Sequence, residues 1–311
     1  MKAKTIKSII RAKIDAWLAT IEDEVLREHA AQNIIVTGGA IASMLMNEPV
    51  NDFDVYFKTR ESALVVANYY VERFQPQSKK GIPCAITVDD SDDRIRIVVK
   101  SAGIASEDGS AQPYEYFEAQ PEGEARAYVA EVMDDPGDIQ DQLDASQEVA
   151  EQADGKPPFR PVFLSTNAIT LSDRVQIVLR FYGEPDTIHE NYDFVHCTNY
   201  WTSWNDALVL RQAALEAILA RELVYVGSKY PVCSIIRLRK FIKRGWTVNA
   251  GQILKAVMQI SALDLTDIAV LQDQLTGVDC AYFCEVIAKL KEKDPAKVNS
   301  AYLIEIIDRM F

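Results

Sequence analysis

The feature that most constrains the fold of this chain is a pair of glycines, Gly38-Gly39, followed by the alternating acids of Asp52-Phe53-Asp54. The apolar residues 33–37 before the glycines and the residues 52–57 predict two short strands. The small and apolar residues 40–46 predict a helix between them. Because side chains alternate along a strand, both aspartates are expected on one face and the neighbouring aromatics on the other.

The chemistry of this motif suits a phosphorylated ligand. Two carboxylates at this spacing are costly to bury together without a cation. Divalent ions between Asp52 and Asp54 would remove that cost and would also bind phosphate oxygens. Gly38 and Gly39 allow the backbone to approach a phosphate closely, and the helix that follows them adds N–H donors and the positive end of its dipole.

The same residues resemble the head of the DNA polymerase beta-type nucleotidyltransferases, which include CCA-adding enzymes, poly(A) polymerases, and antibiotic and toxin nucleotidyltransferases. The resemblance is specific over residues 33–57, looser over 160–245 and absent over 100–158. It implies that Asp52 and Asp54 hold two Mg²⁺ ions, with Mn²⁺ as an alternative, and that the glycines contact a nucleoside triphosphate such as ATP. The family usually has a hydroxyl residue directly after the glycines. Here Ala40 takes that place, so Ser43 or Thr37 would supply the hydroxyl.

The resemblance also implies a third catalytic and metal-binding carboxylate on a later strand. Asp193 begins the strand-like residues 194–197 and has the aromatic neighbours of the corresponding family strand. Its role would be to orient and deprotonate the acceptor hydroxyl. Asp173 and Asp186 are the alternatives, and they are more typical of a turn and of a helix start.

A basic helix is predicted over residues 235–241. Arg237, Lys240 and Arg244 recur at three- and four-residue spacing, opposite an apolar face. The family implies that Arg237 and Lys240 bind the triphosphate or the acceptor. A solvated cationic face is the other interpretation.

The overall pattern predicts an α/β (α+β) head with a mixed sheet over residues 1–200 and an all-helical domain over residues 201–311. An amphipathic N-terminal helix is expected from residues at three- and four-residue steps: Ile6, Ile10, Ile14, Trp17, Ile21 and Val25. Further expected elements are a helix at 60–74, a hairpin at 85–88 and 94–99, strands at 160–164 and 175–181, and helices from Leu208 and over 252–260 and 282–290.

The net charge of −13 is unevenly distributed. Residues 107–155 contain fifteen acidic residues and one basic residue, a net charge of −14, so the rest of the chain carries +1. This segment is expected to be an acidic insertion in a nearly neutral protein. The overall acidity therefore does not exclude a nucleic-acid partner.

Five scattered cysteines argue against a disulfide framework and favour a reducing cytoplasm. No apolar run is long enough to span a membrane, and no signal peptide is recognised. The size and the insertion suit a protein encoded by a phage or mobile element.

Three functions stay open. The first is a nucleotidyltransferase acting on an RNA such as a tRNA-like 3′ end, with release of pyrophosphate. The second is the same enzyme acting on a protein or small-molecule hydroxyl, and the third is an inactive binding or regulatory module. The presence of both acids ranks the third last. The basic helix permits RNA, which we take as the first choice, and the nearly neutral remainder of the chain permits the second function equally.

Overall fold

The computed structural model describes residues 1–73, 84–90, 95–101, 157–164 and 167–265, together with residues 267, 270, 273 and 274. The acidic segment 107–155 and the helix expected at 282–290 lie outside these residues. The helices are α1 (Ala3–Leu18), α2 (Glu24–Ala31), α3 (Gly39–Met46), α4 (Arg60–Arg73), α7 (Pro185–His189), the 3₁₀ helix η2 (Val195–Cys197), α8 (Gln212–Ala220), α9 (Pro231–Lys243) and α10 (Ala250–Ile260). The strands are β1 (Ile34–Thr37), β2 (Phe53–Phe57), β3 (Cys84–Asp89), β4 (Arg96–Ser101), β5 (Pro161–Leu164), β6 (Ala168–Leu171), β7 (Val175–Tyr182), β8 (Tyr200–Thr202) and β9 (Ala207–Val209).

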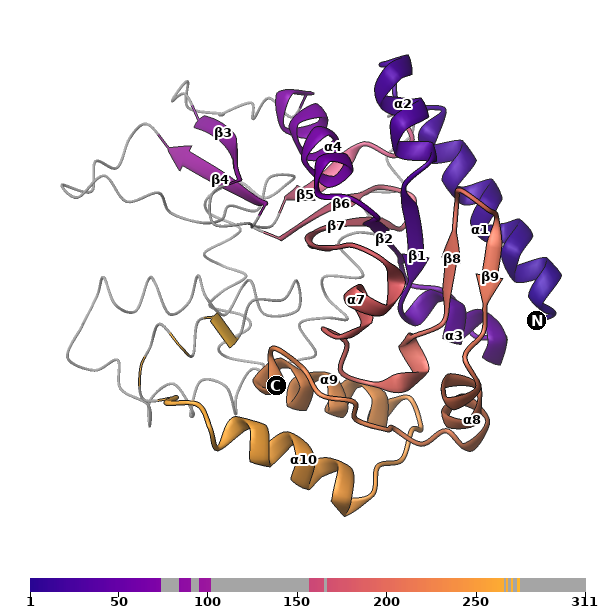
Figure 1. Ribbon diagram of the computed structural model, residues 1–311, viewed down its shortest axis with the longest axis vertical. Helices are drawn as coiled ribbons and strands as arrows, with labels where there is room; N and C mark the ends of the chain where they lie inside the picture. The colour runs from indigo at the N-terminus through magenta and orange to yellow at the C-terminus, as the bar shows by residue number, and fades with distance from the viewer. Residues whose placement is uncertain are drawn as a thin grey trace, which may run out of the picture.

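Seven strands form one mixed sheet in the order β5-β6-β7-β2-β1-β8-β9, and β3 and β4 form a separate antiparallel pair (Figure 1). The strand with the two acids, β2, lies between β1, to which it is antiparallel, and β7, to which it is parallel. The remaining neighbours are antiparallel. The expected mixed sheet, the hairpin and the strand–glycine–helix–strand order are therefore confirmed.

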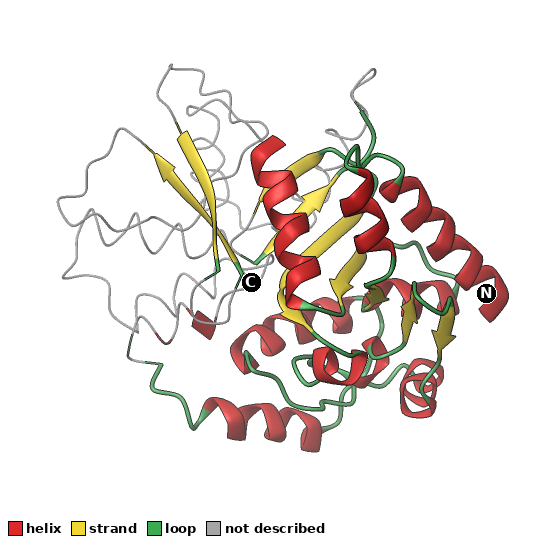
Figure 2. Ribbon diagram, turned by 45° about the horizontal axis from the view of Figure 1, so that its top comes forward, coloured by secondary structure: helices red, strands yellow, loops and turns green. Residues whose placement is uncertain are grey.

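One face of the sheet is covered by α1, α2 and α4 (Figures 1 and 2). Phe53, Val55 and Phe57 of β2 point into this core, as the alternation predicted. The apolar residues of α1 recur once per turn and are fully buried: Ile6, Ile10, Ile14 and Trp17. The helix does not continue to Val25, which is 78% exposed. A second helix begins there because the Asp23 carboxylate accepts a hydrogen bond from the Leu26 backbone N–H and caps it.

The opposite face of the sheet is covered near its middle by α7 and the residues that follow it. Ile35 of β1 and Tyr56 of β2 pack there against Ile188 of α7, with Tyr192 alongside. This is the face to which Asp54 also belongs, because it alternates with Val55. The residues between α7 and β8 therefore lie directly over the acidic strand.

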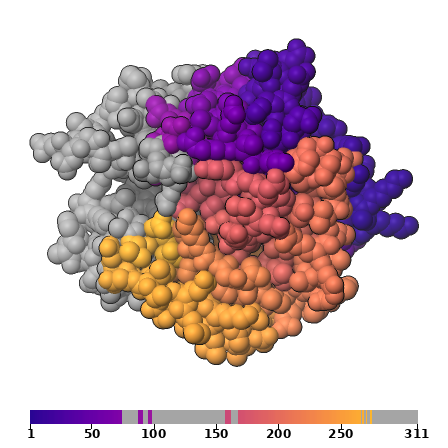
Figure 3. Space-filling model, viewed as in Figure 1, coloured from indigo at the N-terminus to yellow at the C-terminus, as the bar shows by residue number. Residues whose placement is uncertain are grey.

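The helices α8, α9 and α10 pack against α3 and against the residues after α7. Their shared core contains Ala42 of α3, Phe194, Tyr225, Trp246 and Ala256 of α10. On the face shown in the space-filling view, residues near 180–200 are exposed between the N-terminal part above and the helices α9 and α10 below (Figure 3). The sheet continues past residue 200 through β8 and β9, so the expected start of a helical region at 201 falls inside β8. The helix expected from Leu208 is present as α8, but its start was wrong, because Leu208 lies in β9 and the helix begins at Gln212.

The strand expected at residues 194–197 is also wrong, because Val195–Cys197 form η2 and Phe194 forms an isolated bridge with Tyr225. The two edges that such a strand could join are already occupied: β8 pairs with the outer edge of β1, and β7 pairs with β2. The segment instead crosses the end of β1, where the Cys197 carbonyl accepts a hydrogen bond from the Gly38 N–H at 3.1 Å.

Candidate active site

The turn between β1 and α3 depends on Gly38. Its φ of 95° and ψ of −155° lie in a region that is essentially restricted to glycine. A Cβ added at this position would lie less than 3.0 Å from the Asp54 carboxylate. Gly38 therefore allows both the backbone turn and the close approach of the acidic strand to the start of α3.

Gly39 is the first residue of α3 and stands in open space, since an added Cβ would meet no atom within 4 Å. Ala40 is 2% exposed and belongs to the core, so the position next to the glycines faces away from the surface. The Thr37 hydroxyl bonds to His189 Nε2 and donates to the Asn199 carbonyl, both at 2.8 Å. Ser43 lies one turn further along α3 and is half-buried. Ser43 is therefore the hydroxyl better placed to contact a ligand, because that of Thr37 is buried and already bonded.

Asp54 is half-buried, and Asp52 is exposed immediately before β2. The cross-strand partner of Asp54 on β1 is Thr37, and its partner on β7 is Gln176. Burial and then the nearby Asp54 carboxylate raise the pKa of Tyr56, which lies two residues from Asp54 and therefore on the same face of β2. The two neighbours of Asp54 in the sheet are therefore a threonine and a glutamine. Neither is a carboxylate that would enlarge the acidic cluster.

These two acids fit one mode of Mg²⁺ binding. In proteins Mg²⁺ is commonly held by one or two carboxylates together with substrate phosphates and water. Asp52 and Asp54 supply oxygen ligands of this kind next to the N-terminus of α3, which suits an anion. Within the described residues, no group of three or more His, Cys, Asp or Glu side chains could hold a metal ion by itself. The arrangement thus suits a metal ion that arrives with a phosphorylated ligand.

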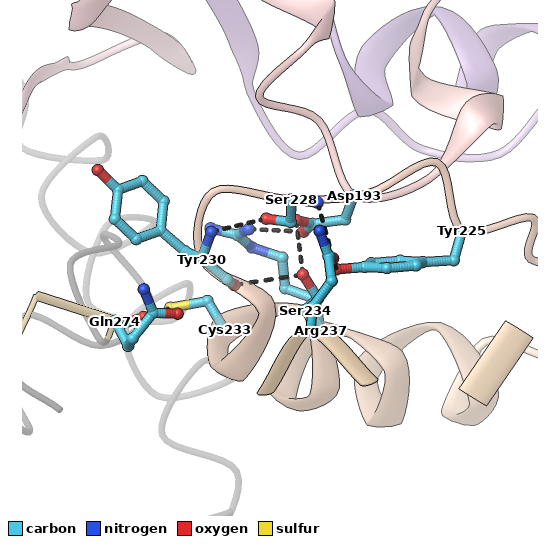
Figure 4. A network of polar contacts seen from close by, with 9 residues as sticks. Asp193, Tyr225, Ser228, Tyr230, Cys233, Ser234, Arg237 and Gln274 are labelled. Carbon is cyan, nitrogen blue, oxygen red and sulfur yellow. Dashed lines mark hydrogen bonds and ion pairs between the residues drawn. The ribbon is translucent and has the colours of Figure 1, made fainter. Parts of the chain in front are cut away.

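Asp193 is buried and held by α9 (Figure 4). Its Oδ1 accepts a hydrogen bond from Ser234 Oγ at 2.8 Å, and its Oδ2 lies 2.6 Å from Arg237 Nη1. The Asp193 carbonyl also accepts from the Val226 N–H at 3.0 Å. The two predicted site residues Asp193 and Arg237 are therefore brought together, and each is the ion-pair partner of the other.

The alternatives to Asp193 have other partners. Asp173 lies in the turn before β7, and its carboxylate accepts from the Phe159 N–H. Asp186 lies in the first turn of α7 and forms an ion pair with Arg211. Both positions agree with the turn and helix-start interpretations.

The basic face of α9 approaches the acidic strand near Cys197. Burial raises the pKa of the Cys197 thiol, Asp54 and Asp193 raise it further, and Arg237 and Arg244 oppose them. Acidic and basic residues thus act on the thiol of Cys197. The backbone carbonyl of the same residue accepts the hydrogen bond from the Gly38 N–H. Lys240 is half-buried one turn beyond Arg237 and forms no ion pair with any of the described residues. Arg237 is therefore held at Asp193, four residues before the Cys197 carbonyl that bonds to Gly38, and Lys240 lies one turn further along the same helix.

One residue of this site, Ser234, was missed from the sequence. Ser234 lies one turn before Arg237 on the same helix face, and that spacing was a usable signal. From the sequence, His196 could be a site residue, since it lies two residues after Asp193, or a structural histidine; in the structure its ring packs against Phe241 and Trp246 with centroid distances of 4.6 and 4.2 Å. Its aromatic surroundings could not be read from sequence, because their members lie some fifty residues apart.

The fold and the site define an α/β protein in which a glycine turn, an acidic strand and a basic helix meet at one end of a mixed sheet. The chain belongs to the Gabija anti-defense 2 family, whose model matches residues 8–221. It is similar to the protein "Gabija anti-defense 2" of Bacillus phage SPbetaL7, with 20% identity over 119 residues. That match covers 38% of this chain and 30% of the relative, so it spans less than a third of the relative's length. The phage source of the relative is consistent with the expected phage or mobile-element origin.

The solved structure "Thermotoga maritima CCA-adding enzyme complexed with tRNA_CCA" is also similar, over 91% of this chain and 56% of that chain. The identity is 11% and the TM-score 0.37, an overlap too low to establish a common fold. Across the described part of the chain, no helix has the length and apolar character needed to cross a membrane.

Proposed function

We propose that this protein is a metal-dependent nucleotidyltransferase that moves a nucleoside monophosphate from a triphosphate to a hydroxyl acceptor, with RNA as the acceptor. We further propose that this transfer serves the anti-defence role named in its family. The observation that carries the proposal is the contact between the Gly38 turn and the Asp54 carboxylate at the N-terminus of α3. It joins an anion-binding helix end to a metal-binding carboxylate, which are the two needs of a metal–triphosphate complex.

In this proposal Asp52 and Asp54 hold Mg²⁺, or Mn²⁺ in its place. The bound metal would neutralise charge on the phosphates. The backbone N–H groups at Gly39 and the hydroxyl of Ser43 would contact phosphate oxygens. Arg237 and Lys240 of α9 would bind the triphosphate from the opposite side. These residues act by position and charge, as is general for phosphoryl and nucleotidyl transfer.

The transfer forms a bond between the acceptor oxygen and the α-phosphorus and breaks the bond from that phosphorus to the oxygen bridging to the β-phosphorus. Pyrophosphate leaves with the electron pair of the broken bond. The acceptor proton passes to the Asp193 carboxylate, which requires that Arg237 no longer cover it. A basic helix face beside the site supports a polyanionic acceptor, whereas a protein or small-molecule hydroxyl would follow the same chemistry.

A second candidate is a nucleotide-binding module without transfer activity. Two observations favour it: the residue beside Asp54 on β7 is Gln176, and Asp193 is paired with Arg237. In this case the protein would bind a metal–triphosphate complex and release it unchanged.

One experiment tests both candidates. The full chain is incubated with each α-phosphate-labelled triphosphate, Mg²⁺ or Mn²⁺, and bacterial total RNA, total protein or small metabolites as separate acceptors. We expect label in RNA with the wild type and none with Asp54→Asn, while Glu61→Gln, an exposed acid on α4, serves as the matched control. Label in protein or metabolites would correct the acceptor. Binding of the triphosphate without label in any fraction would favour the second candidate.

A further inference from the structure

The Asp193–Arg237 ion pair joins a buried carboxylate to a partly exposed guanidinium, and another anion could replace the carboxylate in binding that guanidinium. The Asp193 side chain is 6% exposed, whereas that of Arg237 is 33% exposed. A buried carboxylate needs a charged or hydrogen-bonding partner, because burial of an unpaired charge is costly. Arg237 is at the surface side of the pair and can change partner without crossing the core.

Asp193 keeps other contacts that do not involve Arg237. Ser234, which is 1% exposed, donates its hydroxyl to Oδ1, and the Val226 N–H holds the backbone carbonyl (Figure 4). These contacts fix the position of the carboxylate even when Oδ2 loses the guanidinium. Ser234 is therefore a positioning residue for Asp193.

Arg237 also lies within electrostatic reach of the acidic strand. It pairs with Asp193, and four residues after Asp193 the backbone carbonyl of Cys197 accepts a hydrogen bond from the Gly38 N–H at the end of β1. A triphosphate bound at Gly38 and Gly39 would therefore enter the field of the same guanidinium. Because a triphosphate carries several negative charges and offers a forked pair of oxygens, it would compete well with a single carboxylate for an arginine.

We propose that Arg237 is exchanged between Asp193 and the incoming triphosphate. In the resting protein Arg237 covers Oδ2 of Asp193. When a triphosphate binds, Arg237 turns to its phosphates, and Asp193 is exposed to the acceptor while Ser234 holds it in place. Triphosphate binding and exposure of the base thus become one event, so the acceptor is activated only when the donor is present. This inference rests on the proposed function.

The test measures binding of inorganic tripolyphosphate with Mg²⁺ by calorimetry, using the full chain and four variants: Asp193→Asn, Arg237→Gln, the double variant and Asp186→Asn. Asp193→Asn keeps an acceptor for Ser234 but no longer attracts Arg237. If the pair leaves about a tenth of the molecules with Arg237 available, this variant should bind about tenfold more tightly. Asp186→Asn, which removes an acid paired with a different arginine, should bind as the wild type does.

The gain must depend on Arg237. In the Arg237→Gln background, Asp193→Asn should give no gain, and the double variant is expected to fold because neither partner is left charged. A gain of the same size in that background would reflect only the loss of a negative charge and would overturn the exchange. An equal gain from Asp186→Asn would overturn it as well.

A second measurement uses the wild-type protein and does not depend on the folding of Arg237→Gln. In protein labelled at aspartate carboxyl carbons and arginine side-chain nitrogens, the signals of Asp193 and Arg237 are assigned by their loss in the corresponding variants. Both signals should move with one binding curve when tripolyphosphate is added. A movement of the Arg237 signal without that of Asp193 would refute the exchange.

Neither measurement involves nucleotide transfer, so the two hypotheses fail separately. A wild type that shows the coupled binding but labels no acceptor refutes the proposed function and leaves the exchange intact. Transfer activity with uncoupled signals refutes the exchange alone. No tripolyphosphate binding by the wild type or Asp193→Asn overturns both.

Discussion

Gly38 leaves no space for a side chain against the carboxylate of Asp54, so the turn after β1 and the acid of β2 are fitted to each other. The neighbouring Gly39 has open space instead. The two glycines therefore serve different purposes, although they are identical in the sequence. One is required by the protein itself, and the other is open to a ligand.

Alanine substitutions should separate these two roles. Gly38→Ala should lower the free energy of unfolding by about 1–3 kcal/mol from the backbone alone, with more from the contact with Asp54. Gly39→Ala should keep or raise stability, since alanine favours a helix more than glycine does. If phosphate approaches this backbone, Gly39→Ala should still weaken triphosphate binding. Thermal unfolding and calorimetry on both variants check this, and equal stability loss in the two would contradict the assignment.

Removal of either acid should abolish transfer without loss of the fold. Asp52→Ala and Asp54→Ala each remove a proposed metal ligand, and we expect a decrease in rate of at least about a hundredfold. In the absence of metal the melting temperature should hold or rise, because repulsion between two nearby carboxylates is relieved. Rates are measured with saturating Mg²⁺, alongside the Glu61→Gln control. A variant with near wild-type activity would remove its residue from the site.

Metal and triphosphate should stabilise the protein together. Because the metal connects the acids to the phosphates, a triphosphate with Mg²⁺ at a hundred times its Kd should add about 2.7 kcal/mol to the free energy of unfolding. The same triphosphate with a chelator should add much less. Thermal unfolding with each combination gives the comparison, and equal shifts with and without metal would argue against a metal-dependent site.

The buried histidines should make stability fall in acid. Burial lowers the pKa of His196 and of His189 to about 4, from an ordinary value of 6.5. The unfolded chain therefore takes up protons between pH 6.5 and pH 4 while the folded protein does not. Above pH 6.5 these residues have no effect, and stability decreases as pH falls through that window, by roughly 3 kcal/mol at most for each histidine.

His196→Phe provides the test of this slope. The ring lies among Phe194, Phe241 and Trp246, and neither of its nitrogens has a hydrogen-bond partner in the described part of the chain. Phenylalanine should therefore fit and should remove about half of the decrease between pH 6.5 and pH 4. Denaturant unfolding at a series of pH values measures this, and an unchanged slope would show that His196 is not responsible.

Local patterns in the sequence were sufficient for much of the architecture. The glycine turn between β1 and α3, the acidic strand β2, the hairpin of β3 and β4 and the apolar stripe of α1 were all predicted, because each pattern is contained in a few consecutive residues. The break after Leu18 was missed because Ile21 keeps the apolar spacing although it lies outside a helix. The proposed roles of Asp52, Asp54 and Asp193 stay predictions.

The sequence by itself determined that a glycine turn and two alternating acids would meet at the end of a sheet, since their spacing is set by one strand, one helix and the next strand. Only the tertiary structure decided which distant residues would join them. Competition for the edges of β1 and β2 placed β8 and β7 there, which left residues 195–197 as a 3₁₀ helix and put Gln176 beside Asp54. The same packing brought Arg237 to Asp193, forty-four residues away, because a buried carboxylate must find a partner and α9 supplies it.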